Sequence, residues 1–310
     1  MKPSMIIKVG EEKANLARFH PLYSSALSQH SAGQVLQAQS LYDQLLLIFP
    51  NDAEIIHLSG LAALQLDQYA KSIELISKAI DLKTDFPEAY NNRGNAYRGI
   101  SKYKDAAEDY STAIFLRPDY AMAHNNLAVT LRDMGKLHEA LAEHDAALSL
   151  KPHYREALIK RGTLLIELEK FEDALKDFNK VLLLYPNDLD VLHNRGIALM
   201  KTGQLKKALS DYNQFLEFNP SKKGGYNNRG NIFLELGLYH EALLDFNRAL
   251  ELDPDYAEAL NHRGVVFKEL KRFDEALEGY NKALTLKPDY ADALNNRGVV
   301  YREFGRLNEA

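Results

Sequence analysis

The chain of 310 residues has no cysteine and no tryptophan. Without cysteine, disulfide bonds and thiolate chemistry are excluded. Long apolar runs are missing too, because no stretch approaches the roughly 18 apolar residues that a membrane-spanning helix needs. The first residues, MKPSMIIKVG, hold only a short apolar stretch before charge returns, too little for the core of a signal peptide. We therefore expect a cytoplasmic protein with no membrane partner.

An excess of positive charge is also missing. The chain has 38 Lys and Arg against 43 Asp and Glu, which gives a formal net charge of −5. A general nucleic-acid-binding surface is normally basic, so nucleic acid is not an expected partner. With 46% hydrophobic and 26% charged residues, the composition is that of a soluble protein.

The sequence instead carries a period of 34 residues that runs almost from end to end. Glycine recurs on one lattice, at Gly94, Gly162, Gly196, Gly230, Gly264 and Gly298, and proline on another, at Pro118, Pro152, Pro186, Pro220, Pro254 and Pro288. A fixed period of this size predicts a stacked array of small units rather than one central core. Numbering each unit from 1 to 34, the units begin at residues 19, 53, 87, 121, 155, 189, 223, 257 and 291, and the last is truncated.

Each unit is predicted to hold two short helices. In the unit 87–120, apolar and small residues recur every three or four positions over residues 87–100 and again over 102–118. Between them lies Ser101, and other units have glycine at this place, which suits a left-handed residue that ends the first helix. The residue after each unit's proline, such as Asp119 or Ser221, is expected to cap the next first helix.

This pattern resembles the tetratricopeptide repeat. In the unit 87–120 the matching residues are Tyr90, Gly94, Tyr97, Ala106, Tyr110, Ala113 and Pro118. The resemblance covers about residues 19–310 and leaves residues 1–18 as a tail that we expect to be partly disordered. It implies an all-α fold, in which helix-turn-helix units stack into a right-handed α-α superhelix and the first helices line a concave groove.

Arginine at position 7 of the unit departs from the leucine usual in that family. The units with this arginine mostly carry an acid at position 23, as in Arg93 with Asp109 and Arg195 with Asp211. A guanidinium near the seam between helices needs a carboxylate partner. We therefore predict that these side chains pair within or between adjacent helices.

Asparagine recurs at positions 5, 6 and 9, on the face of the first helix that is predicted to line the groove. The candidate peptide-binding residues are Asn91, Asn92, Asn95, Asn125, Asn126, Asn194, Asn227, Asn228, Asn231 and Asn296. Asparagine is a mediocre helix former, so its recurrence on an exposed face needs a reason. A carboxamide both donates and accepts, so a row of them can hold a peptide backbone whatever its sequence. Alternatively, the asparagines are inherited with each duplicated unit and only keep the face soluble.

Apolar residues interrupt this row in the middle of the chain. Ile159, Ile197 and Met200 occupy groove positions there, which predicts an anchor for a partner's side chain, or else contacts with neighbouring helices. The pair Gly224-Gly225 in a predicted first turn costs about 1 kcal/mol per glycine relative to alanine. It indicates either a hinge or ordinary sequence drift.

The resulting hypothesis is a protein-interaction scaffold that binds an extended peptide segment of a partner protein. The resemblance also implies an alternative, in which the chain is the substrate-recruiting arm of a larger enzyme, such as a glycosyltransferase, with its catalytic domain beyond Ala310. Self-association through an incompletely capped last unit is a third possibility. Clamping of a C-terminal carboxylate, known in chaperone-binding members, is disfavoured because acids such as Glu88 and Glu258 stand at position 2.

No catalytic constellation stands out in the sequence. The two HEAL segments that begin at His138 and His240 lack the second histidine of a zinc-binding helix. The recurrent Asn-Arg-Gly lies inside a predicted helix, so it is not a phosphate-binding loop. We expect no catalytic residue, cofactor or metal site.

Overall fold

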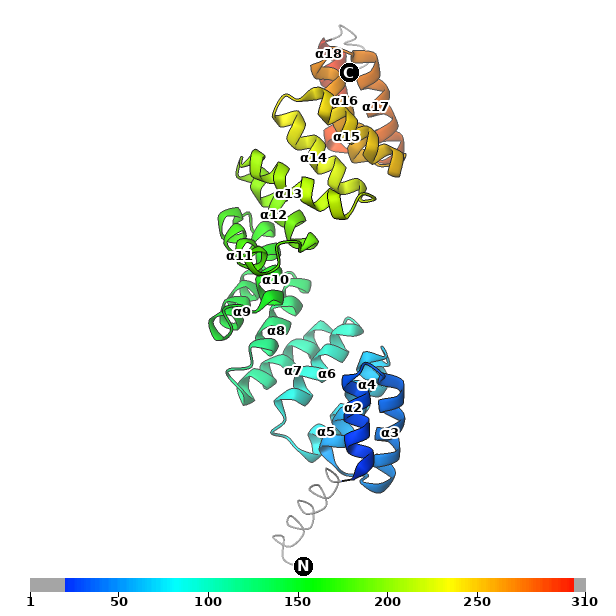
Figure 1. Ribbon diagram of the computed structural model, residues 1–310, viewed down its shortest axis with the longest axis vertical. Helices are drawn as coiled ribbons and strands as arrows, with labels where there is room; N and C mark the ends of the chain where they lie inside the picture. Colours follow the sequence, from blue (N-terminus) through cyan, green and yellow to red (C-terminus); the bar gives the residue numbers. More distant parts are fainter. Residues whose placement is uncertain (1–19, 304–310) are drawn as a thin grey trace, which may run out of the picture. The chain divides into compact units, whose positions relative to one another are not determined.

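The computed structural model describes residues 20–303, which form seventeen α-helices and no strand (Figure 1). The first helices of the units are α2 (Pro21–Ser31), α4 (Ala53–Gln65), α6 (Pro87–Gly99), α8 (Ala121–Asp133), α10 (Arg155–Glu167), α12 (Leu189–Lys201), α14 (Lys223–Glu235), α16 (Ala257–Glu269) and α18 (Ala291–Glu303). The second helices are α3 (Val35–Ile48), α5 (Tyr69–Leu82), α7 (Tyr103–Leu116), α9 (Leu137–Leu150), α11 (Phe171–Leu184), α13 (Leu205–Phe218), α15 (Tyr239–Leu252) and α17 (Phe273–Leu286). The predicted all-α class is confirmed, whereas the right-handed superhelix remains a prediction.

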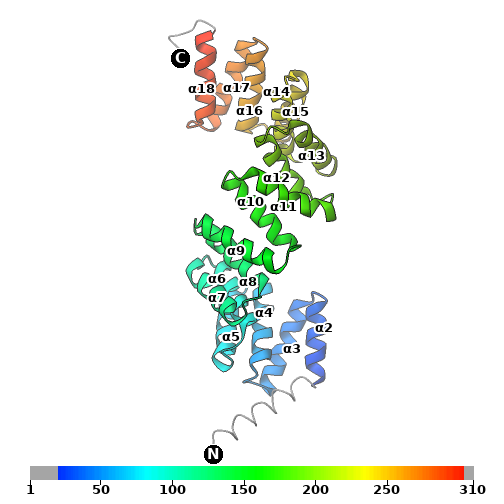
Figure 2. The ribbon, with the colours of Figure 1, turned by 90° about the vertical axis from the view of Figure 1, so that its left-hand side faces the viewer.

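The chain divides into two compact units, residues 1–160 and residues 161–310. Within each unit, a helix packs against the helix before it and the helix after it, and first helices also contact the first helices of neighbouring repeats. In the second unit, for example, α16, α17 and α18 lie side by side in both views (Figures 1 and 2). The predicted tail, residues 1–18, and the last seven residues of the truncated repeat lie outside the described residues.

In the repeats that begin at residues 87, 155, 189, 223 and 257, the core is built on a glycine at position 8 that lies against an aromatic ring at position 24. A Cβ atom on Gly94 would come within 2.8 Å of the Tyr110 ring, and one on Gly230 within 2.7 Å of the Phe246 ring. Tyr110 and Phe246 are fully buried. Because no side chain intervenes, the two helices of the pair approach closely and the ring fills the space between them.

The turn between the two helices uses the left-handed backbone conformation that the sequence predicts. Gly135 has φ +77° and Gly237 has φ +73° at this place, while Ser101 adopts φ +59° without glycine's freedom. Asp67 also occupies the left-handed region, with φ +56°. The prediction for this turn is therefore confirmed, and it holds where the residue is not glycine.

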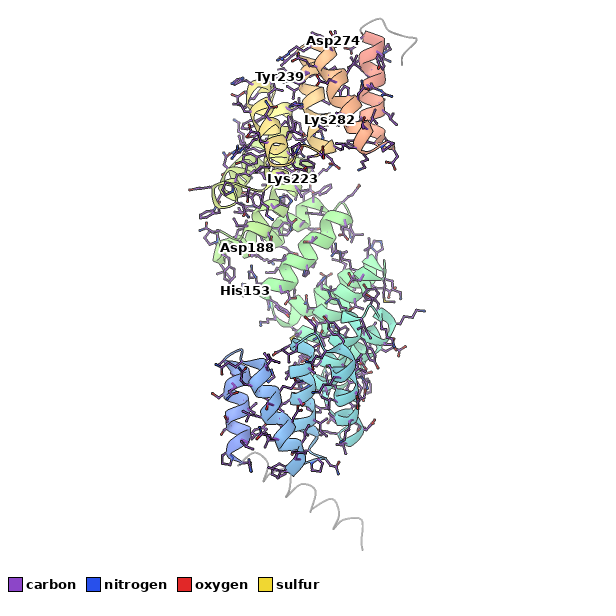
Figure 3. All side chains as sticks on the ribbon, turned by 90° about the vertical axis from the view of Figure 1, so that its right-hand side faces the viewer. His153, Asp188, Lys223, Tyr239, Asp274 and Lys282 are labelled. Atoms are coloured by element: carbon purple, nitrogen blue, oxygen red, sulfur yellow. The ribbon has the colours of Figure 1, made fainter. Side chains whose placement is uncertain are left out.

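The predicted caps at the residue after each proline are wrong for the first helices of several repeats. The N-cap of α8 is Tyr120 rather than Asp119, and that of α14 is Lys222 rather than Ser221. The reason is a one-residue offset, because the turn after the proline places the polar residue one position before the N-cap. Side-chain caps occur where an aspartate stands at the N-cap itself, as Asp52 does before α4 and Asp188 before α12 (Figure 3).

Loops between repeats are fixed by stacked cations and by hydrogen bonds to proline carbonyls. A basic residue at position 31 lies over the ring at position 34, as in Arg117 over Tyr120 with 4.5 Å between guanidinium carbon and ring centroid. In the second unit, Lys282 Nζ donates to the Pro254 carbonyl oxygen of the preceding loop at 3.1 Å (Figure 3). Such contacts join a second helix to the loop one repeat earlier, so they help to set the register of stacking.

Candidate functional site: the first-helix face

The asparagines at position 5 are buried in four of the repeats. Asn91 and Asn125 are 0% exposed and Asn227 is 5% exposed. These carboxamides lie at the seam between neighbouring first helices. Their burial leaves little side-chain surface for a partner, and contact of Asn91, Asn125 and Asn227 with a peptide stays a prediction.

The asparagines form a ladder, but its rungs join one repeat to the next. Asn126 Nδ2 donates to Asn91 Oδ1 at 2.9 Å, and Asn296 Nδ2 donates to Asn261 Oδ1 at 3.0 Å. In each rung, the residue at position 6 binds the residue at position 5 of the preceding repeat, 35 residues earlier. The Oδ1 of the buried carboxamide at position 5 thereby accepts a hydrogen bond. The Nδ2 of the carboxamide at position 6 is occupied in giving it.

Histidine takes the place of asparagine in two other rungs. Asn92 Nδ2 lies 2.9 Å from His57 Nε2, and His262 Nδ1 lies 2.9 Å from Asn227 Oδ1. Burial lowers the pKa of His57 to about 4 and also lowers the pKa of His262. Both rings are therefore neutral near pH 7, which lets His57 accept the hydrogen bond from Asn92.

The carboxamides differ in how much of their hydrogen-bonding capacity is left open. Asn95 accepts from Tyr110 Oη at 2.8 Å and from Asn126 Nδ2 at 3.3 Å. Asn231 occupies the same position 9, but Phe246 replaces the tyrosine, and its carboxamide has no hydrogen bond to any residue of 20–303. Asn194 is half-buried and likewise makes none within that range.

The remaining predicted residues are placed as follows. Asn228 Nδ2 donates to Tyr212 Oη at 2.9 Å. Ile159 is half-buried in the first unit, and Ile197 and Met200 are half-buried on α12 of the second unit. The role of these three apolar side chains as an anchor for a partner stays a prediction.

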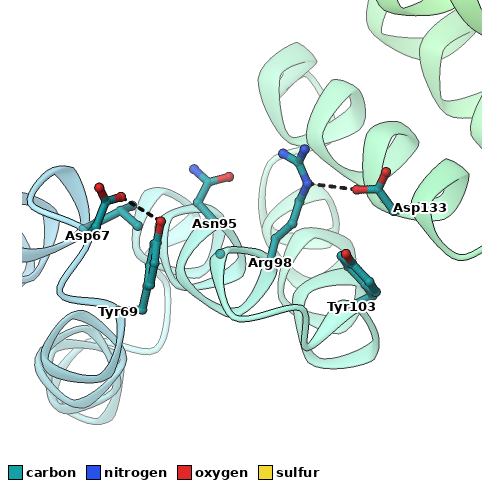
Figure 4. A pocket seen from close by; sticks show the side chains of 8 residues that line it. Asp67, Tyr69, Asn95, Arg98, Tyr103 and Asp133 are labelled. Atoms are coloured by element: carbon teal, nitrogen blue, oxygen red, sulfur yellow. Dashed lines mark hydrogen bonds and ion pairs between the residues drawn. The ribbon is translucent and has the colours of Figure 1, made fainter. Parts of the chain in front are cut away.

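A pocket of about 430 Å³ opens on the first-helix face of the first unit (Figure 4). It is lined by Leu64, Asp67, Tyr69, Asn95, Arg98, Gly99, Tyr103 and Asp133, which come from α4, the turn after it, α5, α6, α7 and α8. Arg98 Nε donates to Asp133 Oδ2 at 3.3 Å, and Tyr69 Oη donates to Asp67 Oδ1 at 2.7 Å. Figure 4 shows Asn95 between these two pairs, so one carboxamide is flanked by groups of both charges.

Sequence reasoning found Asn95 but missed the other polar groups of this pocket. Asp133 stands at position 13, one helical turn after position 9 and so on the same side of the first helix, and its charge was the available signal. Asp67 and Tyr69 belong to the turn and to the start of the second helix, where helical periodicity gives no indication that they reach the same face. The hydrogen bond to Asp67 raises the pKa of Tyr69, which keeps that hydroxyl protonated as a donor.

The predicted pairing of arginine at position 7 with aspartate at position 23 is confirmed. Arg93 Nε and Nη2 each donate to the Asp109 carboxylate at 2.8 Å, and Arg195 binds Asp211 in the same two-pronged way at 2.8 and 2.6 Å. The hydrogen bond to Asp109 raises the pKa of Arg93. Matching pairs form at Arg161 with Asp177 and at Arg229 with Asp245.

A second partner of these arginines, an asparagine, was missed from the sequence. Arg195 Nη1 donates to Asn179 Oδ1 at 2.7 Å, and Asn179 stands at position 25 of the preceding repeat. Asn213, Asn247 and Asn281 do the same for the next three arginines. A hollow of about 340 Å³, lined by Asn179, Arg195 and Asp211 among others, opens over this network between α11 and α13.

Family models match the chain along most of its length. The model described as TPR repeat matches residues 230–271 and 266–305, and models described as tetratricopeptide repeat match residues 53–86, 87–120, 121–151, 155–188 and 189–222. The chain therefore belongs to the tetratricopeptide repeat family. No curated protein matches the sequence significantly.

Solved structures of similar fold include YrrB, described as a TPR protein with an unusual peptide-binding site. It is 29% identical, with a TM-score of 0.52, over 61% of this chain and 97% of YrrB. A tetratricopeptide repeat protein from Parabacteroides merdae is 18% identical, with a TM-score of 0.58, over 80% of this chain and 98% of that one. A chain of the APC/C hetero-tetramer Cut9-Hcn1 is 16% identical, with a TM-score of 0.59, over 86% of this chain. Only about half of that Cut9-Hcn1 chain, 52%, is spanned, and the last two likenesses show the fold alone.

Within residues 20–303, no helix combines the length and apolar character required to cross a bilayer. Over the same residues, no group of three or more His, Asp or Glu side chains is placed to hold a metal ion.

Proposed function

We propose that this chain is a protein-interaction scaffold whose first-helix face holds an extended segment of a partner protein. The observation that carries the proposal is the pocket around Asn95, Arg98 and Asp133, which opens on the face that positions 6, 9, 12 and 13 share (Figure 4). Its volume of about 430 Å³ is within the range of sites that accept a side chain or a small ligand.

The open carboxamides support the same proposal. Asn194 and Asn231 make no hydrogen bond within residues 20–303, so each still offers a donor and an acceptor on the first-helix face of the second unit. A peptide in extended conformation presents backbone N–H and C=O groups at regular spacing, which a carboxamide can satisfy without reading side chains. The peptide-binding site named in the description of YrrB adds support by analogy.

The test begins with peptides of about 12 residues selected from a random phage-displayed library on the whole chain. Affinity for the strongest selected peptide is then measured by fluorescence anisotropy for the native protein and for Arg98→Glu. Charge reversal removes the ion pair with Asp133 and puts two like charges beside the pocket, so we expect at least a tenfold loss of affinity.

Arg248→Glu is the matched control, because Arg248 is an exposed arginine on the second helix α15 and it too pairs with a carboxylate. Affinity should be unchanged in this variant. Equal losses in both variants, or none in either, would contradict a binding site on the first-helix face.

A second proposal is that this repeat array is the substrate-recruiting arm of a larger enzyme. Both proposals use the same face, so peptide binding does not separate them. The intact mass of the protein from its native cell does: a mass close to that of 310 residues supports a scaffold, and a larger mass with an added catalytic domain supports the arm. Self-association is tested by sedimentation velocity over a range of protein concentrations.

A further inference from the structure

The repeat 257–290 keeps the arginine at position 7 but lacks the aspartate at position 23. Gly279 stands where Asp109, Asp177, Asp211 and Asp245 stand in other repeats. The same chain forms this arginine–aspartate pair in four other repeats, whereas Arg263 has no aspartate at position 23. Arg263 and Gly279 stand at positions 7 and 23, which do not belong to the first-helix face proposed above to bind a peptide.

The preceding repeat shows what a complete network requires. Arg229 Nε and Nη2 each donate to the Asp245 carboxylate at 2.7 Å, while Nη1 donates to Asn213 Oδ1 at 2.9 Å. All three nitrogens of the guanidinium are thereby occupied. The hydrogen bond to Asp245 raises the pKa of Arg229.

Arg263 retains only one of these three interactions. Its Nη1 donates to Asn247 Oδ1 at 2.8 Å, as the repeat pattern requires. Its Nε is buried and has no hydrogen-bond partner in the part of the chain that the structure describes. Burial lowers the pKa of Arg263, in contrast to Arg229. A buried N–H without a partner is costly, so this edge of the guanidinium offers donors that an anion can accept from.

We propose that the Nε–Nη2 edge of Arg263 binds the side-chain carboxylate of an aspartate or glutamate from a partner protein. Such a carboxylate restores the two-pronged geometry that Asp245 provides for Arg229, and this is the pairing for which a guanidinium is best shaped. Gly279 contributes no side chain that would occupy the place. Arg263 as a whole is half-buried rather than fully buried, and in the equivalent network around Arg195 and Asp211 a hollow of about 340 Å³ lies beside the pair.

The surroundings favour a single acidic side chain over a strongly acidic segment. Arg272 lies over the Phe267 ring, 4.6 Å from its centroid, and the Arg263 guanidinium is 5.9 Å from the same centroid. Arg272 is itself bound by Glu275. Glu275 and Glu278 both raise the pKa of Arg263 through charge without hydrogen bonding to it. One incoming carboxylate finds a guanidinium edge, whereas several would be repelled by these two glutamates.

The test follows the Hε–Nε signals of arginine in the whole chain by NMR, during titration with three small probes. N-acetyl-glutamate α-amide carries a side-chain carboxylate, N-acetyl-glycine carries a terminal carboxylate, and N-acetyl-glutamine α-amide carries no charge. We expect the Arg263 Hε signal to shift with the glutamate probe and to stay in place with the glutamine probe. A response to N-acetyl-glycine alone, or an equal response to the glutamine probe, would overturn the proposal.

Two different substitutions test the carboxylate site, so the result does not depend on a single variant. Gly279→Asp supplies an internal carboxylate and should weaken binding of the glutamate probe at least tenfold. A Cβ atom on Gly279 would lie 3.1 Å from the Leu260 carbonyl oxygen, so folding of this variant is checked by circular dichroism. Arg263→Lys keeps the charge but removes the two-pronged edge, and it should also lose binding at least tenfold. Unchanged binding in a folded form of either variant would refute the site.

Discussion

Asn126 donates a hydrogen bond to Asn91 at 2.9 Å, although the two residues lie 35 positions apart in the sequence. The bond crosses from one repeat to the next, and Asn91 is fully buried by the contact. Asparagine recurs on the first helices in part because the seam between repeats needs a buried polar pair. The proposed peptide contacts therefore depend on carboxamides that this seam leaves open, such as those of Asn194 and Asn231.

The ladder predicts a stability difference between two asparagines at the same position. Asn261 is 2% exposed and accepts from Asn296, whereas Asn295 is exposed and is in no hydrogen bond within residues 20–303. Asn261→Ala leaves the donor of Asn296 unpaired and should lower the free energy of unfolding by about 1–2 kcal/mol. Asn295→Ala should change it by less than about 0.5 kcal/mol. Urea unfolding of the two variants measures both values, and equal effects would show that the rung does not contribute.

The ion pairs predict a cost for removing one charge while keeping the shape of the side chain. Asp211 is 4% exposed and binds both Nε and Nη2 of Arg195, so Asp211→Asn leaves a largely buried guanidinium without its charge partner. We expect a loss of about 2 kcal/mol, because the arginine keeps some access to solvent. Asp289→Asn, at an exposed loop aspartate, is the control. Thermal and urea unfolding that give the two variants the same stability would refute the structural role of the pair.

Two adjacent glycines at the start of α14 are predicted to respond in opposite directions to alanine. A Cβ atom on Gly224 meets nothing within 4 Å, while one on Gly225 would come within 2.7 Å of Leu216 and 2.8 Å of Phe215. Gly224→Ala should therefore stabilise the chain by up to about 1 kcal/mol, through helix propensity and a less flexible unfolded state. Gly225→Ala should destabilise it by about 1–3 kcal/mol through overpacking.

Differential scanning calorimetry of these two variants gives the sign of each effect directly. A hinge at this pair of glycines would give a different pattern, in which alanine at either place stiffens the segment with little loss of stability. Stabilisation in both variants would contradict the close packing of Gly225 against α13.

The buried histidine of the first ladder rung predicts a dependence of stability on pH. Burial lowers the pKa of His57 to about 4, against about 6.5 in the unfolded chain. As the pH falls below 6.5 the unfolded chain takes up a proton that the folded chain does not, so stability is complete above pH 6.5 and is lost down to pH 4. The loss attributable to His57 should reach about 3 kcal/mol.

Unfolding at pH 7 and at pH 4.5, for the native chain and for His57→Gln, isolates this contribution from those of other titrating groups. The variant should lose less stability than the native chain between the two pH values. An identical loss would mean that His57 is protonated in the folded state without penalty.

The sequence predicted side-chain interactions whose two partners lie within one repeat. It did not predict burial or hydrogen bonds that depend on the neighbouring repeat. Arg195 and Asp211 are 16 residues apart in a unit that fixes both helices, so their pairing follows from the period alone. The burial of Asn91 depends on how closely the first helix of the next repeat approaches. The spacing of residues within one repeat does not determine that distance between helices. The partnership of Asn179 with Arg195 was missed for the same reason.

The pocket of Figure 4 was only partly predictable for a related reason. Helical periodicity placed Asn95 on the side of the first helix where the pocket opens, since its position in the helix determines its direction. Tyr69 reaches the pocket from the start of a second helix, and Asp67 is a turn residue with positive φ. Those directions depend on the geometry of the turn, which the period alone does not specify.

The central claim is that a partner segment lies along the first-helix face, and the side-chain amide spectrum of asparagine tests it most directly. The chain is labelled with ¹⁵N-asparagine and titrated with the strongest peptide from the library. The account predicts that the carboxamide signals of Asn95, Asn231 or both shift. Those of Asn179 and Asn213, which lie on second helices and accept from Arg195 and Arg229, should remain in place. Shifts at Asn179 and Asn213, with none at Asn95 or Asn231, would contradict it.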